Sequence, residues 1–247
     1  MRIIELLGSA PQSQFSISDI SNRLSLDKGT CTNIMKTLAS QGFVQQDLPR
    51  GGYKIGYTLY HLTSGSVAND ELTKIARDDV EKLCASLNET ALLSVIRNDK
   101  RVVLYITTPD RDLLVRTRMN KSVYTANTGR VILANYTSDH LERFIIRNGI
   151  PTQKEWPELY EYNNPDKELR NQFSQIKMNG YSVQIDDNDI FGLAAPIFIN
   201  GHVAGSVGTY LPLFRLTSRN AVLNAVLNTA RSINGKIERL AANKCLR

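Results

Sequence analysis

Between Ile17 and Leu38, apolar residues recur at helical spacing, and this spacing is interrupted once. The first stretch repeats at three- and four-residue intervals, through Ile17, Ile20 and Leu24. After a three-residue connection (25–27), the pattern resumes at Cys31, Ile34, Met35 and Leu38, which we expect to form the buried side of a second helix. Two helices joined so closely form a helix-turn-helix.

Residues next to these helices predict where the helices begin and end. Ser16 and Asp19 have capping-box spacing at a helix start, and Gly42 is suited to end the second helix. Strands over Phe43–Gln46 and Tyr53–Ile55 then flank a turn rich in Pro and Gly. This order predicts a winged helix-turn-helix domain over 1–61, with the helix-turn-helix over about 16–40 and the wing over about 43–56.

The exposed side of the second helix has the composition of a DNA-reading surface. It carries short polar and basic residues: Lys28, Gly29, Thr30, Thr32, Asn33 and Lys36. Asparagine can pair with an adenine edge, and lysine suits phosphate or guanine. Arg50 and Tyr53 at the wing can follow the backbone or the minor groove, and Ser18 completes the predicted DNA-contacting set. The alternative is a protein-interaction module with a solvated polar face.

The remainder of the chain predicts a second domain over 62–247. A linker helix over about 56–70, with Leu59 and Leu62 on one face, leads into a long amphipathic helix. The helical period then ends, and six stretches read as strands: Ala91–Ile96, Arg101–Thr107, Leu113–Thr117, Tyr181–Ile185, Leu193–Ile199 and Ala204–Tyr210. Helices are expected at Asn127–Tyr136, Ser138–Asn148, Pro165–Met178 and Thr217–Ala241. Tight turns such as Asn200-Gly201 favour antiparallel pairing, and hence a two-domain α+β chain.

Composition excludes several classes of protein. The net charge of +6 is concentrated near the C-terminus, so charge alone does not identify a nucleic-acid binder. The three cysteines are odd in number and widely separated, which fits a reduced cytoplasmic compartment. No apolar run approaches the roughly 20 residues of a membrane helix, so no membrane partner is expected.

The motifs needed for catalysis or metal binding are missing. His61, His140 and His202 share no ligand spacing with the cysteines. The acidic loop around Asp186 and Asp189 lacks EF-hand spacing. No nucleophile, base and orienting group come together. We therefore expect no enzyme activity, no metal and no cofactor.

Several spaced motifs give the chain a resemblance to the IclR family of bacterial transcription regulators. Residues 17–30 resemble that family's helix-turn-helix, and residues 35–44 resemble its recognition helix running into the wing. Residues 124–134 are similar to its Ala-Thr-x-x-Gly-Lys-x-x-Leu-Ala element. The stretches 180–183, 193–197 and 215–217 match its later strands and the start of its last helix.

The resemblance implies a winged helix-turn-helix, a linker helix and a GAF-like effector-binding domain whose antiparallel sheet is flanked by helices. It also implies a homodimer or homotetramer that binds a pseudo-palindromic operator on double-stranded DNA. The expected function is that of a repressor of a catabolic operon, responding to a small organic acid. The alternative is a C-terminal domain that only oligomerises and binds no effector.

The resemblance further implies an effector pocket, which departs from the family pattern. Thr128 and Gly129 keep the helix-start element, whereas family Asp, Cys and two Ser positions fall on Gln184, Gly192, Gly208 and Tyr210; Tyr124 lies in the same motif. We expect a larger sugar acid or aromatic acid. Its carboxylate would meet the amides of Thr128 and Gly129, with Gln184 and the Tyr210 hydroxyl as neutral partners. The alternative is a pocket filled by Tyr210.

Overall fold

The computed structural model describes residues 2–10, 13–46, 51–56, 58–59, 71–115 and 122–245, of which 243–245 are described as backbone only. The chain divides into two compact units, Met1–Asn69 and Asp70–Arg247. The predicted boundary between residues 61 and 62 lies outside the described residues, as does nearly all of the linker helix predicted over about 56–70. Both stay predictions.

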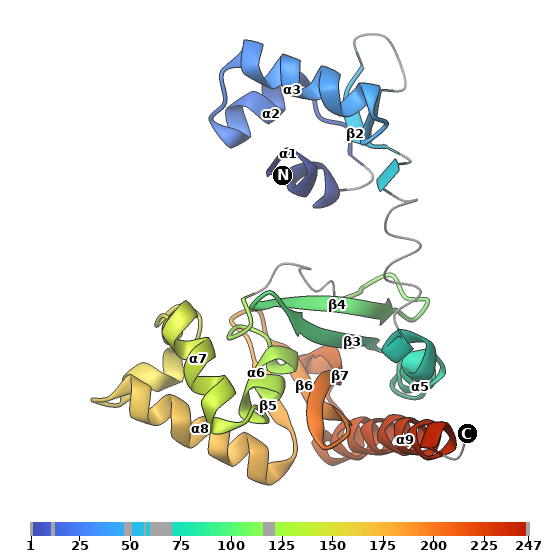
Figure 1. The fold of residues 1–247 in the computed structure, drawn as a ribbon, viewed down its shortest axis with the longest axis vertical. Coiled ribbons are helices and arrows are strands. Elements are labelled where there is room, and N and C mark those ends of the chain that lie inside the picture. The colour runs from blue at the N-terminus through green and yellow to red at the C-terminus, as the bar shows by residue number, and fades with distance from the viewer. Residues whose placement is uncertain are drawn as a thin grey trace. The chain divides into compact units, whose positions relative to one another are not determined.

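The described part of unit 1 is a winged helix-turn-helix, as predicted (Figure 1). Its elements are α1 (Arg2–Gly8), α2 (Ile17–Leu24), α3 (Lys28–Ser40), β1 (Val44–Gln46) and β2 (Tyr53–Ile55). The two strands pair antiparallel, with Val44 opposite Ile55 and Gln46 opposite Tyr53. One small core holds the unit together, formed by Ile3, Leu7, Phe15, Ile20, Cys31, Met35 and Val44.

The prediction that Ile34 is buried is wrong. Its side chain is 37% exposed, whereas Cys31 and Met35 are fully buried. Residues four apart lie almost above one another on a helix, so Cys31 and Met35 both face the core while Ile34 lies at its margin. There Ile34 lines a shallow apolar groove with Leu24 and Leu38.

Unit 2 is an antiparallel α+β domain. Its described helices are α5 (Glu71–Leu87), α6 (Asn127–Ala134), α7 (Ser138–Asn148), α8 (Pro165–Asn179) and α9 (Arg219–Cys245), with short 3-10 turns η1 (Pro157–Glu161) and η2 (Leu213–Arg215). Its described strands are β3 (Thr90–Arg97), β4 (Lys100–Thr107), β5 (Ser182–Ile185), β6 (Ile190–Ile199) and β7 (His202–Pro212). They form one sheet in the order β4-β3-β7-β6-β5, and every pairing is antiparallel.

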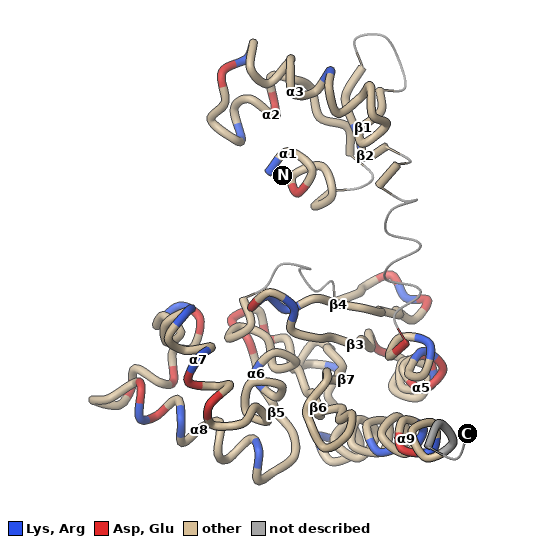
Figure 2. The backbone as a smooth tube through the Cα atoms, in the orientation of Figure 1, with Lys and Arg blue, Asp and Glu red and all other residues tan. Residues whose placement is uncertain are grey.

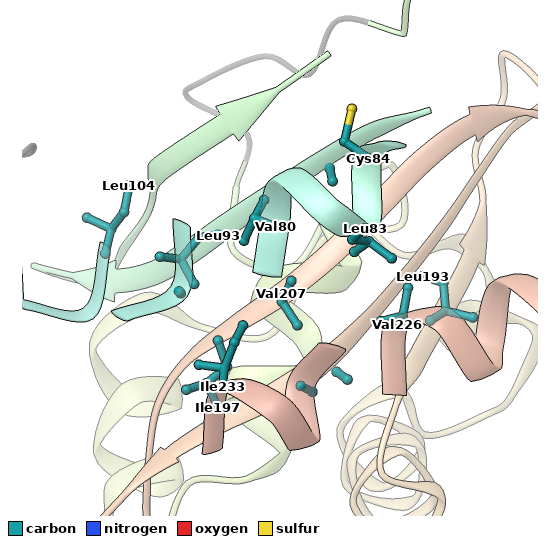
Figure 3. Packing of buried hydrophobic residues seen from close by; sticks show 14 of the residues in the cluster. Val80, Leu83, Cys84, Leu93, Leu104, Leu193, Ile197, Val207, Val226 and Ile233 are labelled. Carbon is teal, nitrogen blue, oxygen red and sulfur yellow. The ribbon is translucent and has the colours of Figure 1, made fainter. Parts of the chain in front are cut away.

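The two faces of the sheet are covered differently. Helices α5 and α9 pack on one face, where Val80 and Leu83 of α5 and Val226 of α9 meet strand residues such as Leu193 and Val207 (Figure 3). Helix α6 lies on the opposite face, and α7 and α8 pack on the same side of the domain (Figure 1). Because strand side chains alternate between faces, the α6 face carries every second residue of each strand.

The strand predicted over Leu113–Thr117 is wrong in its described part. Residues 113–115 have no strand pairing, and the carbonyl groups of Leu113 and Val115 accept hydrogen bonds from side chains instead. The Leu113 carbonyl accepts a hydrogen bond from Arg215 Nη1 at 3.1 Å, and the Val115 carbonyl accepts one from the Thr90 hydroxyl at 3.1 Å. Residues 116 and 117 lie outside the described residues.

Candidate functional site

The first candidate site is the exposed side of α3, and two helix caps set its position. The Ser16 hydroxyl accepts a hydrogen bond from the Asp19 amide at 3.1 Å, and Asp19 Oδ2 accepts one from the Ser16 amide at 2.9 Å, which completes the predicted capping box of α2. Asp27 caps α3 by accepting from the Thr30 amide at 2.9 Å. That bond lowers the pKa of Asp27, because it favours the ionised carboxylate.

Burial of Cys31 and Met35 turns the opposite side of α3 to solvent. Lys28, Gly29, Thr30, Asn33 and Lys36 are exposed, together with Ser18 on α2. Thr32 is half-buried, and its hydroxyl donates to the Lys28 carbonyl at 2.7 Å.

The charge pattern of α3 suits a polyanion. Between Lys28 and Ser40 the helix has two lysines and no acidic residue, and Figure 2 shows only basic positions along it. Its 13 residues span about 20 Å at 1.5 Å per residue. An α-helix of this size fits the major groove of B-DNA.

The wing lies directly beside this surface in unit 1. Tyr53 on β2 exchanges two backbone hydrogen bonds with Phe15, at 2.8 and 3.0 Å, which ties the wing to the segment before α2. Its half-buried side chain also packs against the core of the unit. Arg50, the predicted basic residue of the wing tip, lies outside the described residues.

The second candidate site lies between α6 and the sheet. Across the sheet, Gln184 on β5 is opposite Gly192 on β6, which is opposite Tyr210 on β7. The next row toward the sheet centre on the same face contains Ser182, Ala194 and Gly208. The structure thus brings four of the seven predicted effector residues onto one face.

The two glycines of this face make room for bulky neighbours. A Cβ at position 192 would lie 2.7 Å from Tyr210 Cε1 and 2.8 Å from Asn127 Nδ2. A Cβ at position 208 would lie 3.1 Å from the methyl group of Thr128. Thr128 therefore lies against Gly208, and the Tyr210 ring lies against Gly192. Because Gly192 has no side chain, the Tyr210 ring has room there.

Five buried polar atoms around α6 have no hydrogen-bond partner among the described residues. They are Ser94 Oγ, Asn127 Nδ2, Thr128 Oγ1, Ser182 Oγ and the Tyr210 hydroxyl oxygen. Each parent residue is at least nine-tenths buried. Buried polar groups without partners are uncommon in native proteins. A polar ligand bound on this side of the sheet could supply the missing hydrogen bonds.

The amides at the start of α6 already have partners. The Thr128 amide donates to Asn127 Oδ1 at 3.0 Å, and the Gly129 amide donates to the Ala126 carbonyl at 2.8 Å. A Cβ at position 129 would lie 2.2 Å from the Val123 carbonyl oxygen. Gly129 thus permits a close backbone contact that positions α6.

Tyr124 lies apart from this polar cluster. Its hydroxyl donates to the Gly149 carbonyl at 2.7 Å, and its ring meets Phe144 edge-on in the core below α7 and α8. Burial raises its pKa. The structure therefore gives Tyr124 a packing environment distinct from that of the other predicted effector residues.

Arg130 of α6 is buried without lying in the polar cluster. Its Nε donates to the Tyr124 carbonyl at 2.6 Å and its Nη2 to the Glu155 carbonyl at 3.2 Å. The guanidinium stacks 3.6 Å from the centre of the Trp156 ring. Burial lowers its pKa to about 10. Arg130 ties α6 to the segments before and after α7.

Sequence reasoning missed Ser94, Ser182 and Asn127. A signal was present for Ser94, which is a polar residue within the apolar run of β3, and for Ser182, which lies two residues before Gln184 and so on the same face of β5. Arg101 was also missed. It is 2% exposed at the start of β4, where a charged residue in a strand is a stronger signal than a serine. No cluster of His, Cys, Asp and Glu in the described parts of the chain could hold a metal ion.

Comparison with known protein families decides what these two units are. The model of the bacterial transcriptional regulator IclR C-terminal domain matches residues 64–235, and that of the IclR helix-turn-helix domain matches residues 1–48. The chain belongs to the IclR family. It is an IclR-type DNA-binding transcriptional regulator, and the family consists of regulators and not of enzymes.

Curated IclR-type relatives align over most of this chain. The glycerol operon regulatory protein of Streptomyces griseus is 25% identical over 92% of this chain and 88% of that protein. The transcriptional repressor AllR of Salmonella paratyphi A is 25% identical, covering 89% of this chain and 81% of the repressor.

Solved IclR structures share the fold. The Thermotoga maritima IclR crystal structure superposes with a TM-score of 0.70 at 19% identity, covering 96% of this chain and 97% of the other. An IclR homolog from Microbacterium hydrocarbonoxydans, solved with 4-hydroxybenzoate, gives 0.73 at 17% identity, covering 96% and 98%. Within the described residues, no helix is long and apolar enough to cross a membrane.

Proposed function

We propose that this IclR-type regulator binds a pseudo-palindromic operator as a symmetric homodimer, alone or within a tetramer, through α3 and the wing. The observation that carries the proposal is the side of α3 opposite Cys31 and Met35, which is exposed, polar and free of acidic residues. Asn33 reads a base edge, and Lys28 and Lys36 contact phosphate or guanine. One such helix reads only a few base pairs, so a second half-site requires a second copy.

Selection of duplexes from a random DNA library by the full chain tests this assignment. We expect two inverted half-sites whose centres are about one helical turn apart or a multiple of it. Asn33→Ala should relax preference at one symmetric pair of positions. Lys36→Ala should weaken binding to all DNA sequences alike. It should also reduce the slope of the logarithm of the binding constant against the logarithm of salt concentration by about 1. Lys177→Ala on α8 is the charge-matched control, and equal effects from both lysine variants would refute the assignment.

The oligomer is tested separately by light scattering. A dimer or tetramer mass is expected, because closed symmetric assemblies are the common form of homo-oligomers. A monomer mass at micromolar concentration would contradict the proposed half-site arrangement.

We further propose that the regulator is a repressor of a catabolic operon and that unit 2 binds a small organic acid between α6 and the sheet. Buried polar atoms of Asn127 and Thr128 on α6 and of the sheet face beside it have no partner among the described residues, and they support the proposed effector site. Relatives support the type of control, since one is a glycerol operon regulatory protein and another a transcriptional repressor. The Microbacterium homolog bound to 4-hydroxybenzoate supports an aromatic acid as one candidate class.

One observation favours a second candidate, in which unit 2 only oligomerises. The Tyr210 ring lies against Gly192 and Asn127 and so occupies space that a ligand would need. A thermal-shift screen of sugar acids and aromatic acids on wild type and Tyr210→Ala separates the two. A ligand well above its dissociation constant stabilises the folded state measurably. Stabilisation of the wild type supports an effector; binding only to Tyr210→Ala supports the filled pocket.

A further inference from the structure

Three hydroxyl groups on α3 donate their hydrogen to the helix itself. Each hydroxyl oxygen lies within 3.1 Å of a backbone carbonyl oxygen three or four residues earlier in the chain: Thr32, Thr37 and Ser40. A carbonyl oxygen only accepts hydrogen bonds, so in each pair the hydroxyl is the donor. The hydroxyl oxygens keep lone pairs, and a partner outside the helix can therefore use them only as acceptors.

Hydroxyls in this state match base edges better than they match phosphates. A phosphate oxygen has no hydrogen to donate, so a phosphate contact would first require the hydroxyl to leave its helix carbonyl. In the major groove, by contrast, adenine N6 and cytosine N4 donate hydrogen bonds, and thymine presents a C5-methyl group. A threonine also carries a methyl group, which can make an apolar contact with that of thymine.

Thr37 stands beside Asn33 on the exposed side of α3. It follows Asn33 by four residues, so the two side chains lie on the same side of the helix, and both are exposed. Cys31 and Met35, which face the core, lie on the other side. The Thr37 hydroxyl donates to the Asn33 carbonyl at 3.1 Å. Because this bond holds the χ1 angle of Thr37, the methyl group on the same Cβ is held in place as well.

The exposed side of α3 does not use the residues that favour a helix most. Gly, Thr, Asn and Ser form helices less readily than Ala, Lys, Arg and Glu, yet they occupy five exposed positions: Gly29, Thr30, Asn33, Thr37 and Ser40. On α5, exposed positions instead carry charged residues of high helix propensity, such as Lys74, Arg77 and Glu81 (Figure 2). Local preference is given up most often at functional surfaces, and a contact made by these side chains would account for their presence.

We infer that Thr37 reads a thymine methyl group, and that α3 meets A·T base pairs there, with Asn33 on an adenine and Thr37 on a nearby thymine. This inference rests on the proposed function of α3 as the DNA-reading helix, and it adds Thr37 to the residues that the sequence predicts. One turn of α-helix rises about 5.4 Å, and successive base pairs are about 3.4 Å apart. The thymine therefore lies one or two base pairs from the adenine. The Thr37 hydroxyl makes no phosphate contact.

Replacing thymine by uracil tests the contact on the DNA side. Uracil lacks only the C5-methyl group and still pairs with adenine. The full chain is titrated by fluorescence anisotropy against the selected operator, in which each symmetric pair of thymines is replaced by uracil in turn. We expect one pair, one or two base pairs from the position that Asn33→Ala relaxes, at which uracil weakens binding. The loss should be about fourfold for one half-site, as for one buried methyl group, and about fifteenfold for both.

Two variants separate the methyl group of Thr37 from its hydroxyl. Thr37→Ser keeps the hydroxyl and removes the methyl group. It should bind the thymine operator about fourfold more weakly per half-site and should no longer distinguish thymine from uracil at that pair. Thr37→Val keeps a methyl group and should still distinguish the two bases. Thr229→Ser on α9 is the matched control and should behave as the wild type, because Thr229 donates to the Ala225 carbonyl at 2.8 Å in the same way but lies in unit 2.

The outcomes keep this inference apart from the proposed function. An equal penalty for uracil in wild type and Thr37→Ser overturns the role of Thr37 while α3 remains the reading helix. The same holds if no thymine pair is sensitive to uracil, or if the selected half-sites have only G·C pairs beside the Asn33 position. If Asn33→Ala changes base preference nowhere, both the proposed function and the inference fail. Circular dichroism checks folding, and if Thr37→Ser does not fold, the uracil series and Thr37→Val still decide.

Discussion

Gly192 and Tyr210 face each other across β6 and β7, and the Tyr210 ring occupies the space that any side chain at position 192 would enter. The two residues are packed directly against each other, so a change at one affects the other. Tyr210 is 7% exposed, and its ring packs in a small cluster with Leu92 and Val103. The shape of the α6 face therefore depends on a pair of positions 18 residues apart in the sequence, which neither residue reveals by itself.

Gly192→Ala should destabilise unit 2 by about 1–3 kcal/mol, the usual range for overpacking. The added methyl group would lie 2.7 Å from Tyr210 Cε1. Tyr210→Leu removes that ring atom, so the double variant should recover much of the loss that Gly192→Ala causes alone. Chemical denaturation of all four combinations measures the coupling, and strictly additive effects would show that the two side chains do not compete.

Gly129→Ala should cost more than Gly192→Ala, about 3 kcal/mol or above, because the obstacle is backbone and not a side-chain end. The new Cβ would lie 2.2 Å from the Val123 carbonyl oxygen. Gly235→Ala in α9 is the matched control, since its Cβ would meet nothing within 4 Å. That change should stabilise the helix by about 0.5–1 kcal/mol. Thermal unfolding of the two variants should therefore shift in opposite directions.

Arg130→Met should destabilise unit 2 by about 2–4 kcal/mol, because it leaves the Tyr124 and Glu155 carbonyls without their donor and removes the stacking on Trp156. Arg130→Lys should recover less than half of the lost stability, since one ammonium group cannot reproduce the planar guanidinium and its several N–H donors. Full recovery by lysine, in the same denaturation experiment, would show that only charge matters at this position.

Asp27 should make the stability of α3 depend on pH. Its pKa is lowered by the Thr30 amide, so its stabilisation is present above the unfolded value of about 3.9 and is lost as pH falls through the folded value. Asp27→Asn keeps a capping oxygen that does not titrate there. The stability advantage of wild type over this variant, followed by circular dichroism, should be constant above about pH 5 and should shrink as pH falls from there through the folded pKa, which lies below about 3.9. A constant difference would contradict the assignment.

Much of the fold was predictable because local signals and tertiary packing agree. Ser16 and Asp19 form the capping box that their spacing indicates, and the Asn200-Gly201 turn joins β6 to β7 with positive φ at both residues. Leu113–Val115 shows the limit. Its consecutive apolar residues match a strand, but the Leu113 and Val115 carbonyls accept hydrogen bonds from the Arg215 and Thr90 side chains, and local sequence does not show these contacts.

The site was less predictable because its geometry depends on cross-strand pairs. Gln184, Gly192, Gly208 and Tyr210 were found from the resemblance, and the structure places them on one face. Tyr124 is adjacent to α6 in sequence, yet its hydroxyl is directed to Gly149. Arg101 could not be assigned to the face, since its orientation depends on an irregularity in the β3–β4 register near Leu93 and Ser94.

The order of strands in unit 2 has a consequence for how the protein is made. Strand β7 lies between β3 and β6, although it is the last strand of the sheet to be synthesised. The Thr209 hydroxyl donates to the Thr90 carbonyl across 119 residues of sequence. During synthesis, the β3–β4 hairpin therefore exposes the β3 edge and an apolar face until β7 has been made. Unit 1 does not depend on late segments of the chain, because all its described elements lie within the first 56 residues. Exposed strand edges and apolar surface promote aggregation during synthesis, so unit 2 is the part of the nascent chain that needs protection.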